Sequence, residues 1–179
     1  MPIVETGGAG TPPTGAAPPV LQLLWHDESA TQAFAARLAE QAGLADAFIT
    51  LHGDLGAGKT TLTRHLLHAL GVTGRIKSPT YTIVESYETA AFAIWHFDFY
   101  RFNDPQEWED AGFRDIFASP GLKLAEWPQK ADGLLPQADL DIALFTENES
   151  ARRATLSSST PRGAAIVQAL AAAVQGPGA

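Results

Sequence analysis

The chain has 179 residues, the length of one globular domain, and its hydrophobic content of 45% is enough for a packed core. It contains no cysteine, which excludes disulfides, thiolate metal sites and cysteine catalysis. With 20 acidic and 12 basic residues the formal net charge is −8, so we expect contact with RNA only indirectly, through a partner. The sequence has neither a basic and apolar leader nor an apolar run of membrane-spanning length, which predicts a cytoplasmic protein without membrane contact.

The N-terminal residues 1–19 contain five prolines and four glycines, and we expect them to form a disordered extension of a single domain over residues 20–179. The first expected strand spans residues 20–25. The segment Ser29-Ala30-Thr31-Gln32 has the S-x-x-Q form of a capping box, so it predicts the start of a helix that ends near Gly43.

The next unit is a short apolar strand at residues 47–52, a glycine-rich loop at residues 53–60 and an amphipathic helix at residues 61–70 that stops at Gly71. The loop reads Gly-Asp-Leu-Gly-Ala-Gly-Lys-Thr and matches G-x-x-x-x-G-K-[ST] at every fixed position. Since the motif lies between a strand and a helix, it predicts a phosphate-binding loop.

The chemistry of this loop depends on its spacing. Gly56 and Gly58 allow a tight turn in which successive N–H groups converge on a phosphate. Lys59 then reaches the β- and γ-phosphates of a nucleotide, and the Thr60 hydroxyl is placed to bind a magnesium ion. The magnesium ion needs a further carboxylate from elsewhere in the chain.

Beyond this unit the middle of the sequence is dominated by strands. They are expected over residues 81–87, 91–99, 122–127, 140–145 and 154–158, of which the last two pair as a hairpin. One helix begins at Pro105 with Asp104 as its cap, and a final helix spans residues 164–174. This order predicts an α/β fold, a three-layer P-loop NTPase-like domain with a mixed β-sheet.

Two carboxylates are candidates for the nucleotide site. Asp98 lies near the end of an apolar strand, where a charge needs a cation, a metal or several N–H donors, and Glu126 ends another strand. The alternatives are an Asp98 satisfied by local backbone or by Arg101, and a Glu126 exposed to solvent at a sheet edge. For Ser78-Pro79-Thr80 a proline turn is favoured over a segment that senses the γ-phosphate.

Histidine and tryptophan residues carry weaker signals. His96 is expected to be a packed strand residue, and His65 and His68 lack the spacing to a third ligand that zinc requires. The four tryptophans are scattered, which indicates core or interface positions.

Together with these residues, the sequence resembles the bacterial TsaE (YjeE-type) ATPases, which take part in making threonylcarbamoyladenosine on tRNA. The resemblance extends from about Asp27 to about Phe145. Four motifs carry it, namely residues 53–61, Lys77-Ser78-Pro79-Thr80-Tyr81-Thr82, His96-Phe97-Asp98-Phe99-Tyr100-Arg101 and Glu126-Trp127-Pro128.

The resemblance implies that Thr60 and Glu126 bind magnesium, that Asp98, Thr80 and Lys59 serve hydrolysis of ATP to ADP, and that the segment from Asp27 to Thr31 borders the adenine. It also implies a late arginine at the nucleotide, for which Arg152 and Arg153 are both candidates. The nucleotide-binding residues implied are Glu28, Thr31, Asp54, Leu55, Gly56, Ala57, Gly58, Lys59, Thr60, Thr61 and Arg152. The implied partners are two paralogous subunits of the threonylcarbamoyl transferase complex (TsaB/TsaD type).

Two other functions compete with an ATPase. A small-molecule kinase needs an acceptor pocket and usually an arginine-bearing lid, whereas the eight arginines here are dispersed. A guanine-nucleotide switch needs an Asn-Lys-x-Asp stretch to read guanine, and the sequence has none.

Overall fold

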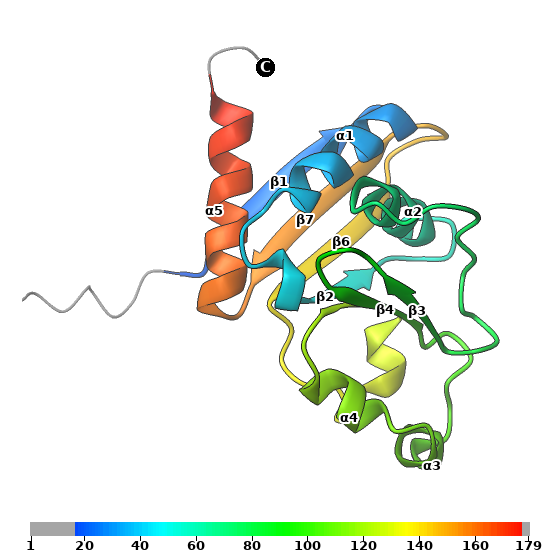
Figure 1. The fold of residues 1–179 in the computed structure, drawn as a ribbon. Helices are drawn as coiled ribbons and strands as arrows, with labels where there is room; N and C mark the ends of the chain where they lie inside the picture. Colours follow the sequence, from blue (N-terminus) through cyan, green and yellow to red (C-terminus); the bar gives the residue numbers. More distant parts are fainter. Residues whose placement is uncertain (1–16, 177–179) are drawn as a thin grey trace, which may run out of the picture.

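The computed structural model describes residues 17–176, which form one mixed seven-stranded sheet with helices on both faces (Figure 1). The strands are β1 (Val20–Trp25), β2 (Phe48–His52), β3 (Val84–Glu88), β4 (Ala93–Asp98), β5 (Leu122–Glu126), β6 (Leu140–Thr146) and β7 (Arg152–Ser158). The helices are α1 (Glu28–Ala39), α2 (Lys59–Ala69), α3 (Pro105–Asp110), α4 (Phe113–Ala118) and α5 (Pro161–Gln175), with single 3-10 turns η1 (Leu44–Asp46) and η2 (Pro128–Ala131). The extension expected over residues 1–19 lies, up to residue 16, outside the described residues.

The strand order is β1-β7-β6-β2-β5-β4-β3, with β6, β2, β5 and β4 parallel to one another. Strand β3 pairs antiparallel with β4, and β7 pairs antiparallel with both β6 and β1, so the hairpin expected near the C-terminus is confirmed. The carboxyl ends of the parallel strands lie on the same side of the sheet, and there Asp98 is directly beside Glu126 in the register. Open α/β sheets bind their ligands at the carboxyl ends of their strands.

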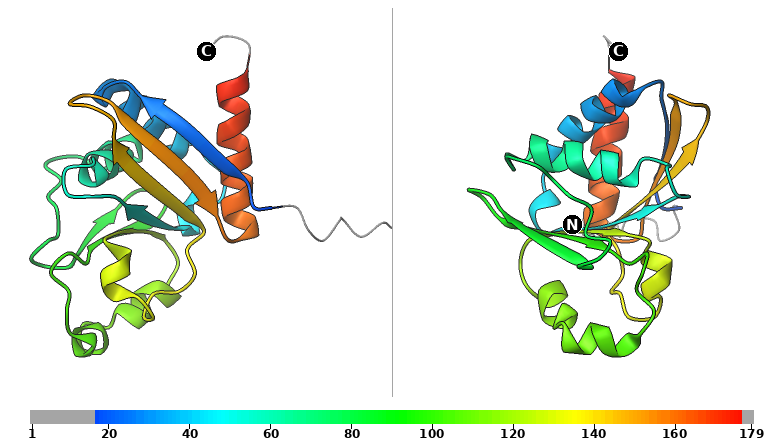
Figure 2. Two further views of the ribbon diagram at one scale, coloured as in Figure 1. Left: turned by 180° about the vertical axis from the view of Figure 1, so that it is seen from behind. Right: turned by 90° about the vertical axis from the view of Figure 1, so that its right-hand side faces the viewer.

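The sheet separates two hydrophobic clusters, which makes the three layers visible in Figure 2. Helices α1, α2 and α5 cover one face, whereas α3, α4 and η2 cover part of the other. The second cluster is largely aromatic, with the ring centroid of Phe113 at 5.3 Å from that of Phe97 and 5.5 Å from that of Trp108. Side chains alternate along a strand, so Ile94 joins the first cluster and Phe97 the second. His96 and Asp98 therefore lie on the face covered by α2.

Several helix boundaries differ from those expected. Helix α1 is capped by Asp27 and not by Ser29: the Asp27 carboxylate accepts from the Ala30 N–H at 3.0 Å and from the Ser29 hydroxyl at 2.6 Å. A negative cap also interacts favourably with the helix dipole. Helix α2 already begins at Lys59, and α5 begins at Pro161 with the Thr160 hydroxyl as its cap. Asp104 caps α3 as expected.

The strand expected at residues 81–87 begins only at Val84. The preceding residues form a turn in which the Ile83 N–H donates to the Pro79 carbonyl at 2.7 Å and Ile83 has a φ of +67°. Helix α4 is an element that the sequence did not predict. It follows α3 after Gly112, whose φ of +69° breaks the helical path between the two. Within residues 17–176 no helix combines the length and the apolar character that a bilayer crossing requires.

Candidate functional site

The glycine-rich loop turns from β2 into α2, as the motif predicts. Gly56 and Gly58 have φ angles of +82° and +105°, a region that disfavours residues with a side chain. Lys59 is the first residue of α2 and is 4% exposed. Its Nζ donates to the carbonyls of Gly53 at 2.6 Å and Asp54 at 2.9 Å.

The Lys59 ammonium group is held in an unusual setting. Its Nζ also lies 4.2 Å from the centre of the Trp127 ring, which provides a cation–π contact. Burial lowers the pKa of Lys59 below its ordinary value, although the charges of Glu126 and Asp98 oppose this shift. A poorly solvated cation at the mouth of the loop is a strong partner for an incoming phosphate.

Thr60 and Glu126 meet at the start of α2. The Thr60 hydroxyl lies 3.1 Å and 3.0 Å from the two Glu126 carboxylate oxygens. Glu126 is 2% exposed because β5 is an inner strand between β2 and β4, so the alternative of a solvent-exposed edge glutamate is wrong. His96 on β4 lies beside them, with its Nε2 at 2.8 Å from Glu126 Oε1.

Asp98 is 3% exposed and accepts three hydrogen bonds. Ser78 and Thr80 donate their hydroxyls to Oδ2 at 2.9 Å and 3.0 Å, and the Tyr100 N–H donates to Oδ1 at 2.9 Å. The proline turn at Pro79 therefore also brings two hydroxyls to the site. Of the alternative partners of Asp98, local backbone supplies one donor, the Tyr100 N–H, whereas the Arg101 guanidinium carbon lies 4.5 Å from the centre of the Tyr81 ring.

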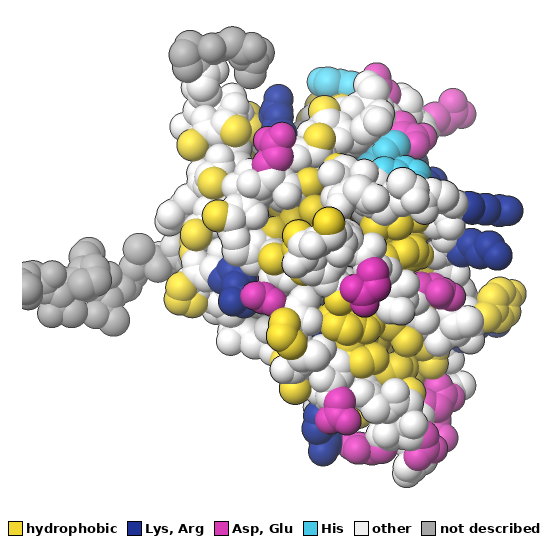
Figure 3. All heavy atoms as spheres, in the orientation of Figure 1, with side chains coloured by type: hydrophobic (Ala, Val, Ile, Leu, Met, Phe, Trp, Pro, Cys, Tyr) yellow, Lys and Arg dark blue, Asp and Glu magenta, His cyan; other side chains and the backbone are white. Residues whose placement is uncertain are grey.

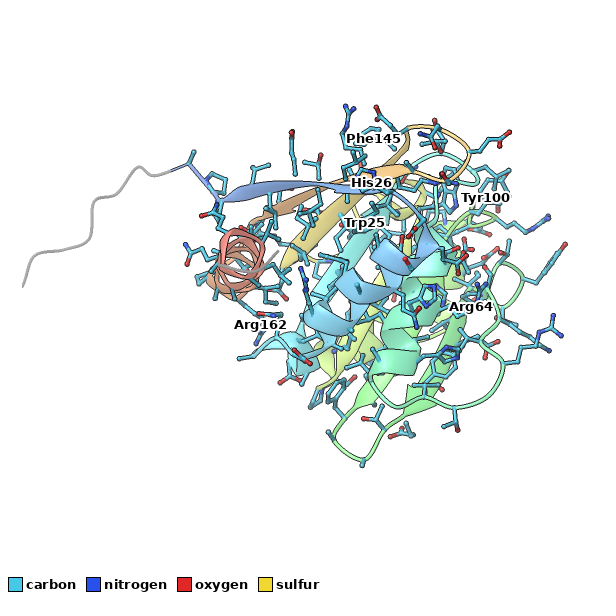
Figure 4. All side chains as sticks on the ribbon, turned by 90° about the horizontal axis from the view of Figure 1, so that it is seen from above. Trp25, His26, Arg64, Tyr100, Phe145 and Arg162 are labelled. Carbon is cyan, nitrogen blue, oxygen red and sulfur yellow. The ribbon has the colours of Figure 1, made fainter. Side chains whose placement is uncertain are left out.

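Two adjoining pockets meet at the glycine-rich loop. The first is a cavity of about 290 Å³ between β1, α1 and the loop, and Trp25, Glu28, Thr31, Ala57, Thr61 and Arg152 are among its lining residues. The second, of about 310 Å³, contains the carboxylates and hydroxyls just described, and its lining includes Leu55, Lys59, Thr60, Thr80, Asp98, Tyr100, Glu126 and Trp127. Arg162, at the start of α5, is not among the lining residues of either pocket, and Figure 4 shows it far from Tyr100, which lines the second.

Arg152 connects the two pockets. Its Nε donates to the Ala57 carbonyl at 3.1 Å and its guanidinium lines both cavities. Arg153, the other candidate, has its side chain paired with Glu147 at 2.7 Å. Of the two arginines, the structure thus brings Arg152 to the loop.

Sequence reasoning missed two residues that lie within this arrangement. His96 was expected to be only a packed strand residue, and Trp127 to be core or interface. Trp127 has a φ of +55° and lies between Lys59 and Tyr100, whose ring centre is 5.0 Å from its own. Their positions in the sequence could have indicated this. His96 precedes Asp98 by two residues, which places both on one face of a strand, and Trp127 directly follows Glu126.

Among residues 17–176 no group of three or more histidine and carboxylate side chains is arranged to hold a metal ion. His65 instead pairs with Glu28 at 2.9 Å. Thr60 and Glu126 offer the hydroxyl and carboxylate oxygens that magnesium prefers when phosphates supply further ligands. The residues present therefore fit magnesium.

Comparison with known proteins gives one consistent result. The family model described as "Threonylcarbamoyl adenosine biosynthesis protein TsaE" matches residues 25–154. The chain is 46% identical over 121 residues to the tRNA threonylcarbamoyladenosine biosynthesis protein TsaE of Haemophilus influenzae, an alignment that covers 68% of this chain and 76% of that protein. With the Bacillus subtilis protein of the same name the identity is 39% over 107 residues, covering 60% of this chain and 66% of that protein.

A solved structure supports the same assignment. The crystal structure of Bacillus subtilis YdiB superposes with a TM-score of 0.72 at 27% sequence identity, covering 90% of this chain and all of that one. This match and the strand order confirm the expected P-loop NTPase-like fold. The matched residues include the glycine-rich loop, Asp98 and Glu126. The chain belongs to the TsaE family, whose members take part in the biosynthesis of threonylcarbamoyladenosine on tRNA.

Proposed function

We propose that this protein is a magnesium-dependent ATPase that hydrolyses ATP to ADP and phosphate and so drives partner subunits in tRNA threonylcarbamoyladenosine synthesis. The observation that carries the proposal is the pocket in which Lys59, Thr60, Asp98 and Glu126 converge beside the glycine-rich loop. A phosphate-binding loop, a pair of oxygen ligands for magnesium and a separate buried carboxylate are the parts that ATP hydrolysis requires.

The residues divide between binding and chemistry. Lys59 and the N–H groups of residues 54–61 would hold the phosphates. Thr60 and Glu126 would hold magnesium, which when bound neutralises charge on the phosphate oxygens. Asp98 would orient the attacking water and accept its proton, and the Thr80 hydroxyl would keep that carboxylate in position.

The cavity between β1, α1 and the loop would take the nucleoside. Glu28, Thr31 and Thr61 line it together with Trp25. Arg152 lies where this cavity meets the second pocket, which contains Lys59. Its mixed polar and apolar lining suits a base and a ribose. We expect adenine to be preferred, because the sequence lacks the Asn-Lys-x-Asp element that reads guanine.

The same site would couple hydrolysis to partners. Ser78 and Thr80 belong to the segment between α2 and β3 and contact Asp98 through their hydroxyls. A phosphate that changes these contacts would change the outer surface of the segment. Figure 3 shows acidic side chains in several groups, interspersed with Lys and Arg, on one face. The net charge of −8 fits a subunit that leaves tRNA to TsaB/TsaD-type partners in the cytoplasm.

The test of the ATPase is hydrolysis of ATP with and without magnesium. Glu126→Ala should weaken magnesium-dependent ATP binding, because the ion loses its anionic protein ligand. Asp139→Asn is the matched control, since Asp139 is also buried but bonds the Phe48 N–H at the opposite end of the sheet. Magnesium titrations of Glu126→Ala that overlay the wild type would refute the ligand assignment. Transfer of phosphate to an added metabolite would establish the small-molecule kinase instead.

The test of the coupling uses the two partner subunits. We expect slow hydrolysis by the protein alone, faster hydrolysis in the mixture, and an affinity for the partners that depends on the bound nucleotide. By linkage, if ATP strengthens the complex, the complex must strengthen ATP binding by the same factor. Thr80→Ala should reduce both effects. Equal rates in all mixtures, with association insensitive to nucleotide, would refute the coupling.

A further inference from the structure

We propose that His96 is a positioning residue that holds the Glu126 carboxylate ready for magnesium. The proposal rests on the proposed role of Glu126 as a metal ligand. His96 lies on β4 next to β5, and its side chain is fully buried. Its Nε2 is 2.8 Å from Glu126 Oε1, whereas its Nδ1 has no hydrogen-bond partner among the described residues.

These contacts assign the tautomer. A proton on Nε2 is donated to a carboxylate oxygen, which makes a charge-assisted hydrogen bond. A proton on Nδ1 would be buried without any acceptor, which costs more than a lone pair without a donor. Of the two tautomers of the ring, this pocket therefore favours the one with its proton on Nε2.

The hydrogen bond restricts how Glu126 can turn. One carboxylate oxygen receives the His96 N–H, and the Thr60 hydroxyl lies at 3.0–3.1 Å from both oxygens. The carboxylate is thereby aimed at the start of α2, where the Thr60 oxygen is the second protein ligand expected for the ion. A glutamate has three side-chain torsions, and ordering them before the ion arrives removes an entropic cost of binding.

The unpartnered Nδ1 argues against a purely structural role. A leucine at this position would bury no polar atom, so packing alone does not explain an imidazole between β3 and β5. The imidazole costs stability through Nδ1 and contributes one useful contact, that with Glu126. Removal of the ring should therefore impair the metal site more than the fold.

The experiment compares His96→Leu, His96→Gln and the control Ile94→Val. The amide nitrogen of glutamine extends about as far from the backbone as Nε2, so it restores the donor that leucine removes. Ile94 is a fully buried neighbour on the same strand face, and its shortening perturbs packing without touching Glu126. Two quantities are measured: the magnesium concentration that gives half-maximal ATP binding in calorimetry, and the melting temperature of the nucleotide-free protein.

We expect His96→Leu to raise the half-saturating magnesium concentration by about tenfold. Its melting temperature should fall by a few degrees at most, because the buried Glu126 carboxylate loses one donor but keeps the Thr60 hydroxyl. His96→Gln should return the magnesium value toward the wild type, and Ile94→Val should lower the melting temperature alone. A wild-type magnesium value in His96→Leu, or equal impairment in the leucine and glutamine variants, would overturn the inference. If Glu126→Ala also leaves the magnesium value unchanged, the proposed metal site itself fails; if only His96→Leu does, the positioning role alone fails.

Discussion

Replacing Asp98 by asparagine should separate ATP binding from hydrolysis. The substitution keeps the shape of a side chain that is 3% exposed and removes its charge. The Tyr100 N–H can only donate, so the amide oxygen must remain opposite it, as Oδ1 does now. The new NH₂ group then points at Ser78 and Thr80, whose hydroxyls can turn from donors into acceptors.

The size of each effect follows from these contacts. All three hydrogen bonds survive, two of them with donor and acceptor exchanged, so the lost charge assistance should cost about 1 kcal/mol of folding stability. The proton acceptor, by contrast, is lost entirely. Removal of a general base lowers a rate by about 10²- to 10⁴-fold, which corresponds to about 3–5 kcal/mol in the barrier. Hydrolysis should fall far more than stability or ATP affinity.

Single-turnover hydrolysis with the protein in excess over ATP measures the chemical step, and calorimetry measures binding. Asp104→Asn is the matched control, because Asp104 caps α3 outside the site and accepts from the Gln106 N–H at 2.9 Å. A folded Asp98→Asn protein that hydrolyses ATP at the wild-type single-turnover rate would show that Asp98 is structural. Loss of affinity in parallel with the rate would assign Asp98 to binding.

Three further predictions concern the cations of the site. Lys59→Ala should weaken ATP binding by about 100-fold or more in calorimetry, whereas Lys123→Met, which removes another buried lysine, should leave it unchanged. A Lys59→Ala protein with the ATP affinity of the wild type would refute the assignment of the glycine-rich loop to phosphate binding. Because burial lowers the Lys59 pKa, the ligand-free protein loses this proton at a lower pH than an ordinary lysine, and phosphate restores it. ATP affinity should therefore fall as pH rises through the lowered pKa of Lys59. Calorimetry in two buffers of different ionisation heat measures the proton uptake that accompanies ATP binding. No uptake in that pH window would contradict the assignment of Lys59 to phosphate binding. Arg152→Ala should weaken ATP binding about tenfold and Arg153→Ala should not, and the reverse order would exchange their roles.

Much of this protein could be predicted from local sequence patterns. The glycine-rich loop needs backbone angles that Gly56 and Gly58 supply, and its flanking strand and helix show hydrophobic periods of their own. The hairpin of β6 and β7 and the Asp104 cap follow equally from neighbouring residues. These features depend on interactions within a few residues, which any window of the sequence contains.

Other features required the folded chain. Asp27 and Ser29 are both residues that can cap a helix, and only the extended backbone at Asp27 makes it the cap of α1. Arg152 and Arg153 are adjacent in sequence, yet side-chain alternation on β7 places one at the loop and the other at Glu147. His96 meets Glu126 across 30 residues because β4 and β5 pair in register. Sheet register and burial arise from contacts distant in sequence, so only the tertiary structure determines which polar side chains share a site.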